Sequence, residues 1–429
     1  MKEKSKQLIK SKIAWIYEKG VFHILGTSVI NKVLSFLTNI FIVRFLTKAD
    51  YGVFGYANNI ISFFILVSGL GMLSGILQYG SEQGDEPTKN SFFRYGMRFG
   101  AIINGVLGIL IVLYVIFIPI TIKEAGIYIL QLCLLPIFDY AYNYFCIILR
   151  CKKENKKYSL LLNINTTTYL IFSCLGAFLF GITGVIMGRY CSYLISIVMG
   201  YRQCGYAKIR AYTTRALQKK QKQEIIKYSS VCCASNALSQ VLYLLDVYLI
   251  AEFVRNVEVV ASYKVATLIP TALDFIPLGI ITFVYPYFAE NNKDYNWIKS
   301  HTKQLFCIMG GINCILSLVL FFGAPLIIEL LWGADYMDAL VPFRILSINY
   351  FITGTFRILS GNILAMLKKV KVNLYVSLFA GVSNIILDIV LIKRYGSNGA
   401  AIATMGVVII SSLISGVALI YNINKLKEK

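Results

Sequence analysis

Long runs of apolar residues alternate with short polar segments over almost the whole chain. Each run is close to the ~20 residues that an α-helix needs to cross the hydrocarbon core of a bilayer. Twelve runs are predicted to be transmembrane helices: about 21–43, 53–77, 93–118, 126–149, 159–180, 183–201, 228–251, 261–288, 304–328, 340–366, 372–392 and 398–422. Only the turn Gly181–Gly184 separates the fifth and sixth runs, so we expect these two helices to form an antiparallel hairpin.

The distribution of basic residues predicts the orientation of these helices. Loops rich in Lys and Arg stay on the cytoplasmic side of a membrane. If the N-terminus is inside, 31 of the 42 Lys and Arg residues fall in cytoplasmic segments and seven on the opposite side. We therefore predict that both termini are cytoplasmic. Residues 1–20 mix lysines with apolar positions and lack a signal-peptide cleavage site, which favours an amphipathic helix lying on the cytoplasmic face.

The second half of the chain repeats the first. Residues 181–188 align with residues 396–403 at an offset of 215, and residues 147–153 align with residues 363–369 at an offset of 216. Because each half has six spans, both halves insert with the same orientation, as in parallel-repeat transporters. We predict an all-α integral membrane protein of two six-helix bundles. Its segments are a cytoplasmic helix (1–20), an N-terminal lobe (21–201), a basic linker (202–227), a C-terminal lobe (228–422) and a basic tail (423–429).

Composition supports the membrane class and limits what the net charge can mean. The chain is 57% hydrophobic and 15% charged, whereas soluble chains carry about 25% charged residues. A net charge of +21 would suit nucleic acid, a membrane surface or an anionic cargo. Most of the surplus lies in the scattered cytoplasmic segments, and elsewhere basic and acidic residues are equal in number. We therefore predict no nucleic-acid partner.

Cysteine and histidine offer little for a metal site or a disulfide framework. All ten cysteines lie within apolar runs or at their ends, no Cys-x-x-Cys occurs, and there are two His. We expect free cysteines that pack among apolar residues. The sequence predicts no metal site and no cofactor.

Short loops argue against an enzyme. The chain has no long outer loop that would hold a catalytic site, and it has no GxxxxGK[ST] phosphate-binding loop. We expect transport and no catalysis. Two alternatives remain from other classes: a membrane-embedded glycan polymerase or transferase, and a scaffold that assembles such enzymes.

Basic residues within spans are the candidates for cargo binding, because a charge at mid-membrane is retained where it faces protein, water or cargo. Lys32, half-way along the first span, borders a polar face that includes Asn31 and Asn39. The alternative to cargo binding is that Lys32 forms an ion pair with an intramembrane Asp. Arg357, at the middle of the tenth span, is equally a candidate for cargo contact and for a buried ion pair. The other candidates lie nearer span ends, where snorkelling to the interface is sufficient: Arg44, Lys264 and Arg344.

Four carboxylates also fall within spans: Asp139, Asp246, Asp274 and Asp388. One interpretation is that they neutralise the intramembrane cations. The other is that one of Asp246, Asp274 and Asp388 binds a coupling ion, H⁺ or Na⁺. The sequence does not select among these three.

Several motifs resemble one known family. They are Asn31–Phe36, Val43–Gly52, the turn Gly69–Gly71, the Gly181-x-x-Gly184 and Gly396-x-x-Gly399 signatures, and the outer segment Leu331–Tyr336. Together they resemble bacterial polysaccharide flippases of the MOP exporter superfamily, with the O-antigen (Wzx-type) branch as the nearest likeness. The resemblance implies a V-shaped fold of twelve helices, a central cationic cavity and a cargo of undecaprenyl-diphosphate-linked oligosaccharide, moved by alternating access.

The same resemblance bears on single residues. Lys32 stands where the related lipid II flippase has an Arg in its first span, so the charge is kept and the bidentate fork is lost. That relative also has a cavity Arg in its eighth span, and here Lys264 is the nearest cation.

The hypothesis from the sequence is a flippase of the bacterial cytoplasmic (inner) membrane. Its cargo would be an O-antigen, capsule or exopolysaccharide repeat unit, its coupling ion H⁺ or Na⁺, and a glycan polymerase complex a potential partner. A cation-coupled multidrug exporter of the same superfamily is the alternative, although a site for drug cations would favour acidic residues.

Overall fold

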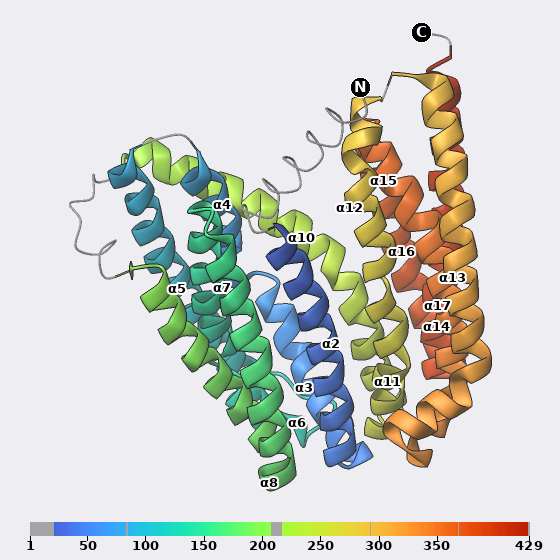
Figure 1. Ribbon diagram of the computed structural model, residues 1–429. Coiled ribbons are helices and arrows are strands. Elements are labelled where there is room, and N and C mark those ends of the chain that lie inside the picture. The colour runs from blue at the N-terminus through green and yellow to red at the C-terminus, as the bar shows by residue number, and fades with distance from the viewer. Residues whose placement is uncertain (1–20, 83–84, 207–216, 292, 368, 428–429) are drawn as a thin grey trace. The chain divides into compact units, whose positions relative to one another are not determined.

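The computed structural model describes residues 21–82, 85–206, 217–291, 293–367 and 369–427, and in these ranges it consists of helices and turns (Figure 1). The predicted helix 1–20 lies outside the described residues. The first half has α2 (Val21–Phe45), α3 (Lys48–Ile65), η1 (Ser68–Gly71), α4 (Met72–Ser81), α5 (Glu86–Phe117), α6 (Ala125–Gln131), α7 (Leu135–Cys151) and α8 (Asn155–Gln203). The second half has α10 (Lys219–Val254), α11 (Val257–Leu273), α12 (Phe275–Glu290), α13 (Tyr295–Trp332), η2 (Ala334–Ala339), α14 (Leu340–Ile352), η3 (Thr353–Arg357), α15 (Ile358–Met366), α16 (Val370–Tyr395) and α17 (Ser397–Asn424).

The chain forms two compact units. Among the described residues, the first unit contains those of 21–50 and 57–241, and the second contains those of 51–56 and 242–427. The division falls within α10, later in the chain than the linker predicted at residues 202–227, of which residues 207–216 are not described. The exact domain limits therefore stay a prediction.

Many of the helices are long and apolar enough to cross a membrane. Eight helical stretches of the described chain qualify by themselves, one of them running from α11 into α12 and another from η2 to α15. The number rises to as many as ten if each of two bent pairs counts as one span, α3 with η1 and α4, and α6 with α7. The 49-residue α8 contains both the fifth and the sixth predicted spans. The seventh predicted span lies in α10, where apolar residues share the helix with many polar and charged ones, and α10 is not among the ten. The protein is a multi-pass membrane protein.

The fifth and sixth predicted spans form the expected hairpin. At Gly181 the backbone of α8 has φ 58° and ψ −138°, a conformation open to glycine and costly for residues with a Cβ. A Cβ added to Gly184 would lie 1.9 Å from the carbonyl oxygen of Gly176, so the two arms pack with their backbones in contact. In addition, Ser173 Oγ donates to the carbonyl of Val185 across the hairpin.

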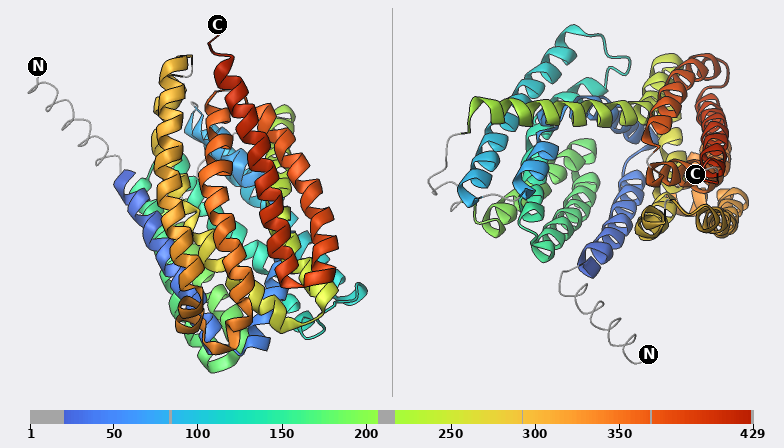
Figure 2. Two further views of the ribbon diagram at one scale, coloured as in Figure 1. Left: turned by 90° about the vertical axis from the view of Figure 1, so that its right-hand side faces the viewer. Right: turned by 90° about the horizontal axis from the view of Figure 1, so that it is seen from above.

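The C-terminal unit contains the same hairpin. Gly396, between α16 and α17, has φ 57° and ψ −133°, and the two helices lie side by side (Figure 2). A Cβ on Gly399 would lie 2.1 Å from the carbonyl oxygen of Leu391. The turn glycine, the close-contact glycine and its partner are each displaced by 215 residues from those of the first hairpin. The repeat in the sequence is therefore a repeat of backbone geometry.

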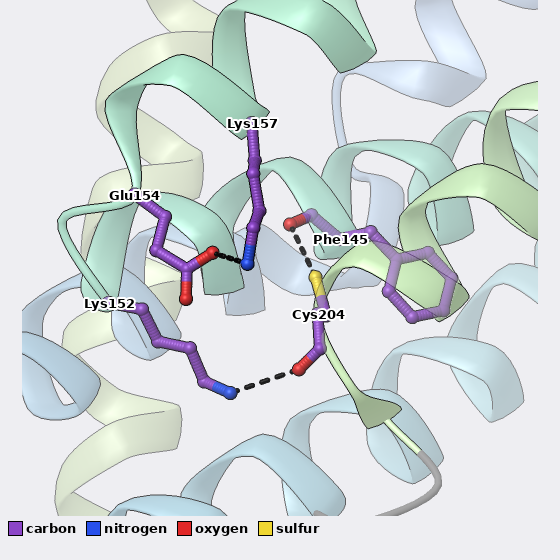
Figure 3. Close-up of polar contacts among 5 residues, drawn as sticks. All are labelled: Phe145, Lys152, Glu154, Lys157 and Cys204. Atoms are coloured by element: carbon purple, nitrogen blue, oxygen red, sulfur yellow. Dashed lines mark hydrogen bonds and ion pairs between the residues drawn. The ribbon is translucent and has the colours of Figure 1, made fainter. Parts of the chain in front are cut away.

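Figure 3 shows how the ends of α7 and α8 are joined in the N-terminal unit. Lys152 Nζ donates to the carbonyl of Cys204 at 3.0 Å, which places a cation at the C-terminus of α8, where it is electrostatically favoured. Cys204 Sγ in turn donates to the carbonyl of Phe145, 3.5 Å away. Lys157 pairs with Glu154 beside them. Cys204 is buried, and this burial raises the pKa of its thiol to about 12. As predicted, all ten cysteines are free.

Candidate functional site

Lys32 lies on the exposed side of α2, whose other side packs against α8. Within the described part of the chain, no hydrogen bond or ion pair holds its ammonium group. Its neighbour Asn31 is half-buried, and no donor reaches Asn31 Oδ1 among the described residues. Asn39 Nδ2 donates a hydrogen bond to the carbonyl of Ser35 on the same helix, at 2.9 Å. Arg44 is exposed in the last turn of α2. The first span thus presents an exposed lysine beside amide groups.

Two of the candidate cations, Lys264 and Arg344, lie in the second unit and donate hydrogen bonds to backbone carbonyls. Lys264 Nζ donates to the carbonyl of Gly55, in the same unit, at 3.2 Å. Arg344 Nε donates to the carbonyl of Phe321 at 3.2 Å, and its guanidinium lies over the Phe321 ring, 5.4 Å from the centroid. These contacts give Arg344 a packing role between α14 and α13.

Arg357 is the last residue of η3, a single π-helical turn in the tenth predicted span. Its Nη1 donates to Ser411 Oγ of α17. The side chain is half-buried. Arg357 is thus positioned by a local departure from α-helical geometry, and π turns are frequent at functional sites.

Two of the three candidate ion-coupling residues meet in the C-terminal unit. Asp246, from α10, and Asp388, from α16, lie within hydrogen-bonding reach of each other, and their exposed fractions are 8% and 0%. Asp246 Oδ2 accepts from Tyr263 OH at 2.7 Å and from Thr404 Oγ1 at 2.9 Å. Asn384 Nδ2 donates to Asp388 Oδ2 at 2.8 Å. We call these five residues the acidic cluster.

In each of the two carboxylates, one oxygen accepts no hydrogen bond from a described residue. In the described part of the protein, no hydrogen-bond donor reaches Asp246 Oδ1 or Asp388 Oδ1. Two adjacent buried carboxylates cannot both stay ionised without a proton or a cation between them. Carboxylate, hydroxyl and amide oxygens are suitable ligands for a hard cation. Among the described residues, no group of three or more His, Cys, Asp or Glu lies close enough together to hold a metal ion.

Asp274 lies elsewhere, at the break between α11 and α12. It interacts electrostatically with Tyr350 of α14. Asp139, in the N-terminal unit, accepts from Tyr193 OH at 2.9 Å and interacts electrostatically with Arg189, which donates to Asn58 Oδ1. Neutralisation by a nearby cation is thus an interpretation that suits Asp139, which lies near Arg189, whereas Asp246 and Asp388 lie next to each other.

Sequence reasoning did not find the neutral members of the acidic cluster. Asn384 and Asp388 are four residues apart, a spacing that places both side chains on one helical face, and this could have been noticed. Tyr263 and Thr404 carry no such signal, because they approach Asp246 from other helices.

The family model described as "Polysaccharide biosynthesis protein" matches residues 18–292, well over half of the chain. The chain belongs to this family. A search of curated proteins finds no match.

Solved structures show which fold this polysaccharide biosynthesis protein adopts. An inward-facing multidrug resistance MATE transporter of the MOP superfamily superposes with a TM-score of 0.79 at 12% identity, covering 93% of this chain and 96% of that one. The lipid II flippase MurJ, in an inward closed conformation, gives 0.73 at 17% identity, covering 95% and 90%. A MOP-superfamily transporter from Pyrococcus furiosus gives 0.62 at 13% identity, covering 96% of each chain. The predicted fold class, the two-lobed helical fold of MOP transporters, is confirmed.

Proposed function

We propose that the protein is a flippase that moves undecaprenyl-diphosphate-linked oligosaccharide from the cytoplasmic to the outer leaflet of the bacterial cytoplasmic membrane by alternating access. Membership of the polysaccharide biosynthesis family supports a glycan cargo. The similarity in fold to MurJ, whose stated cargo is lipid II, supports a lipid-linked one. The cargo carries a diphosphate, and this anion would have to be attracted within the membrane.

Lys32 is the observation that carries the proposal. A lysine in the middle of a span costs several kcal/mol unless it faces water or a counter-charge. Here it is exposed, and no described residue bonds to it. An ammonium group in this situation is available to a diphosphate. In the C-terminal unit Arg357 is the proposed second contact, and its fork can take two phosphate oxygens.

The other candidates take lesser parts in this proposal. Asn31 and Asn39 lie on the same helix as Lys32 and would form hydrogen bonds with sugar hydroxyls. Arg44 and Lys264 would attract the anion from positions nearer the span ends. Arg344, which packs on Phe321, is the least available of the cations.

The acidic cluster is the proposed coupling site. Its open oxygens on Asp246 and Asp388 would bind Na⁺ or H⁺, and the inward gradient of that ion would drive transport. Asp274, the third candidate, stays separate from this pair and is proposed as the weakest of the three.

A flipping assay in proteoliposomes tests the cargo site. The probe is a fluorescent undecaprenyl-diphosphate-linked oligosaccharide, and the variants are Lys32→Ala, Lys32→Arg and Arg357→Ala. We expect each Ala variant to lower the flipping rate by about 10- to 100-fold, the effect of losing a hydrogen bond to a charged group. Lys32→Arg should retain most of the rate.

Lys293→Ala is the matched control, because Lys293 is an exposed lysine in the turn between α12 and α13. It should flip the probe at the normal rate. Normal rates in both Lys32→Ala and Arg357→Ala, at normal expression, would remove this site assignment.

A multidrug exporter is the second candidate, favoured by the TM-score of 0.79 to a multidrug MATE transporter. It predicts that expression of the protein lowers the accumulation of cationic dyes in cells, and that Lys32→Ala leaves this export unchanged.

A further inference from the structure

The helix of the tenth predicted span changes its hydrogen-bonding pattern for one turn. The N–H of Ile358 donates to the carbonyl of Thr353, five residues back, where an α-helix would bond four residues back. The turn therefore holds one residue more than an α-helical turn. If residues 353–357 became α-helical, Arg357 and the residues after it would rotate by about 100° and shift by about 1.5 Å.

One buried side chain of another helix bonds to Thr355 in the middle of this turn. Asn313 of α13 has an exposed fraction of 0%. Its Oδ1 accepts from Tyr350 OH at 2.9 Å, and its Nδ2 donates to Thr355 Oγ1 at 3.2 Å. A Cβ on Gly354 would lie 2.8 Å from Asn313 Nδ2, so the backbone of the turn is pressed against the amide. Asn313 thus contacts Tyr350 before the π turn, and Gly354 and Thr355 within it.

These bonds favour the π turn over an α-helical one. Conversion to an α-helix would move Thr355 away from Asn313 and leave a buried amide donor without an acceptor, which is costly in a protein interior. The π turn in turn places Arg357, whose guanidinium reaches Ser411 on α17. A link therefore runs from Asn313 through the turn to the direction of Arg357.

We propose that Asn313, Tyr350 and Thr355 are positioning residues: by maintaining the π turn they aim Arg357 at α17. The role of Arg357 in transport rests on the proposed function, whereas the link between Asn313 and the direction of Arg357 does not.

Cross-linking measures this direction without reference to transport. In a background lacking the ten native cysteines, Arg357→Cys and Ser411→Cys are combined and treated with a short bifunctional thiol reagent. We expect Asn313→Ala to lower the cross-linking yield by ~10-fold or more, because two hydrogen bonds of a buried amide are lost. Tyr350→Phe, which removes one hydroxyl, should give a smaller loss and serves if Asn313→Ala fails to fold. Asn362→Ala is the control, since this amide lies on the same helical run and donates to the carbonyl of Ile358 in its own helix.

Deletion of Gly354 separates a change of register from general disruption. Without Asn313 the turn relaxes to an α-helix that is one residue too long, and removing one residue restores the phase of residue 357. Asn313→Ala combined with deletion of Gly354 should therefore recover cross-linking, and with Arg357 present it should recover flipping. In the flipping assay, Asn313→Ala with Arg357→Ala should be no slower than Arg357→Ala alone.

Two results would overturn the proposal. One is normal cross-linking in folded Asn313→Ala and Tyr350→Phe variants. The other is loss of cross-linking that deletion of Gly354 does not restore in a folded protein. If cross-linking behaves as expected while Arg357→Ala flips normally, the positioning network stands and the proposed cargo site falls.

Discussion

Replacing Asp388 with Asn tests the acidic cluster most directly. Asn has nearly the size of Asp and can still accept the hydrogen bond from Asn384. The substitution nevertheless removes one of two adjacent carboxylates. If a coupling cation binds between Asp246 Oδ1 and Asp388 Oδ1, the variant loses one charged ligand. A charge-assisted interaction contributes about 1.5–3 kcal/mol, so we expect Asp388→Asn to raise the ion concentration for half-maximal transport by about 10- to 100-fold.

The assay measures flipping in proteoliposomes at a series of Na⁺ concentrations with fixed pH, and then at a series of pH values without Na⁺. Thermal unfolding provides a second measurement, because a ligand that binds only the folded state stabilises it. Added coupling ion should raise the melting temperature of the unaltered protein by roughly 2–4 °C for each kcal/mol of binding. It should raise that of Asp388→Asn much less.

Glu329→Gln is the control for this experiment. Glu329 is an exposed carboxylate near the end of α13, so its loss should leave both ion dependences unchanged. An Asp388→Asn variant with the same ion dependence of flipping and of melting as the unaltered protein would refute ion binding at the acidic cluster.

Three further predictions concern other parts of the fold. Gly181→Ala should destabilise the N-terminal unit by about 1–3 kcal/mol, because the φ of Gly181 is 58°, although there is open space for the added Cβ. The control is Gly279→Ala, which also adds a Cβ in open space but lies within α12, and it should not destabilise the protein. If both variants had the same melting temperature, the argument from the backbone conformation would be contradicted. Cys204 should resist iodoacetamide at pH 8 until the protein unfolds, because a pKa of about 12 leaves roughly a thousandth of the thiolate of a cysteine with the ordinary value of 9.0; rapid labelling of folded protein, read by mass spectrometry, would show that its burial is misassigned. Arg344→Gln should lower the melting temperature and leave flipping unchanged, since the guanidinium packs on Phe321; slow flipping at normal stability would return Arg344 to the cargo site.

The features that the sequence predicts well are those set by local pattern. The hairpin at Gly181 follows from a turn too short for any other arrangement, and its repeat at Gly396 follows from the alignment of the two halves. Lys32 can be recognised from the sequence because a charged lysine in the middle of a span is costly in free energy unless it faces water, protein or cargo.

Contacts between distant segments could not be predicted in the same way. Asp246 and Asp388 are separated by more than a hundred residues, and nothing in the sequence distinguishes this pair from Asp274. The π turn that ends at Arg357 is harder still to predict, because the residue proposed to maintain it, Asn313, is an ordinary polar residue of another span.

The 215-residue offset between the two hairpins has an evolutionary consequence. Applied to the charged positions, it pairs Ser173 with Asp388 and Arg189 with Thr404. At equivalent places, one half therefore carries an arginine and a neutral hydroxyl where the other carries a hydroxyl and a buried acid. If the halves arose by duplication of one ancestral six-helix unit, they kept its backbone and diverged in electrostatic sign. The two halves therefore differ in charge at equivalent backbone positions, so a substitution that is tolerated at a position of one half need not be tolerated at the equivalent position of the other.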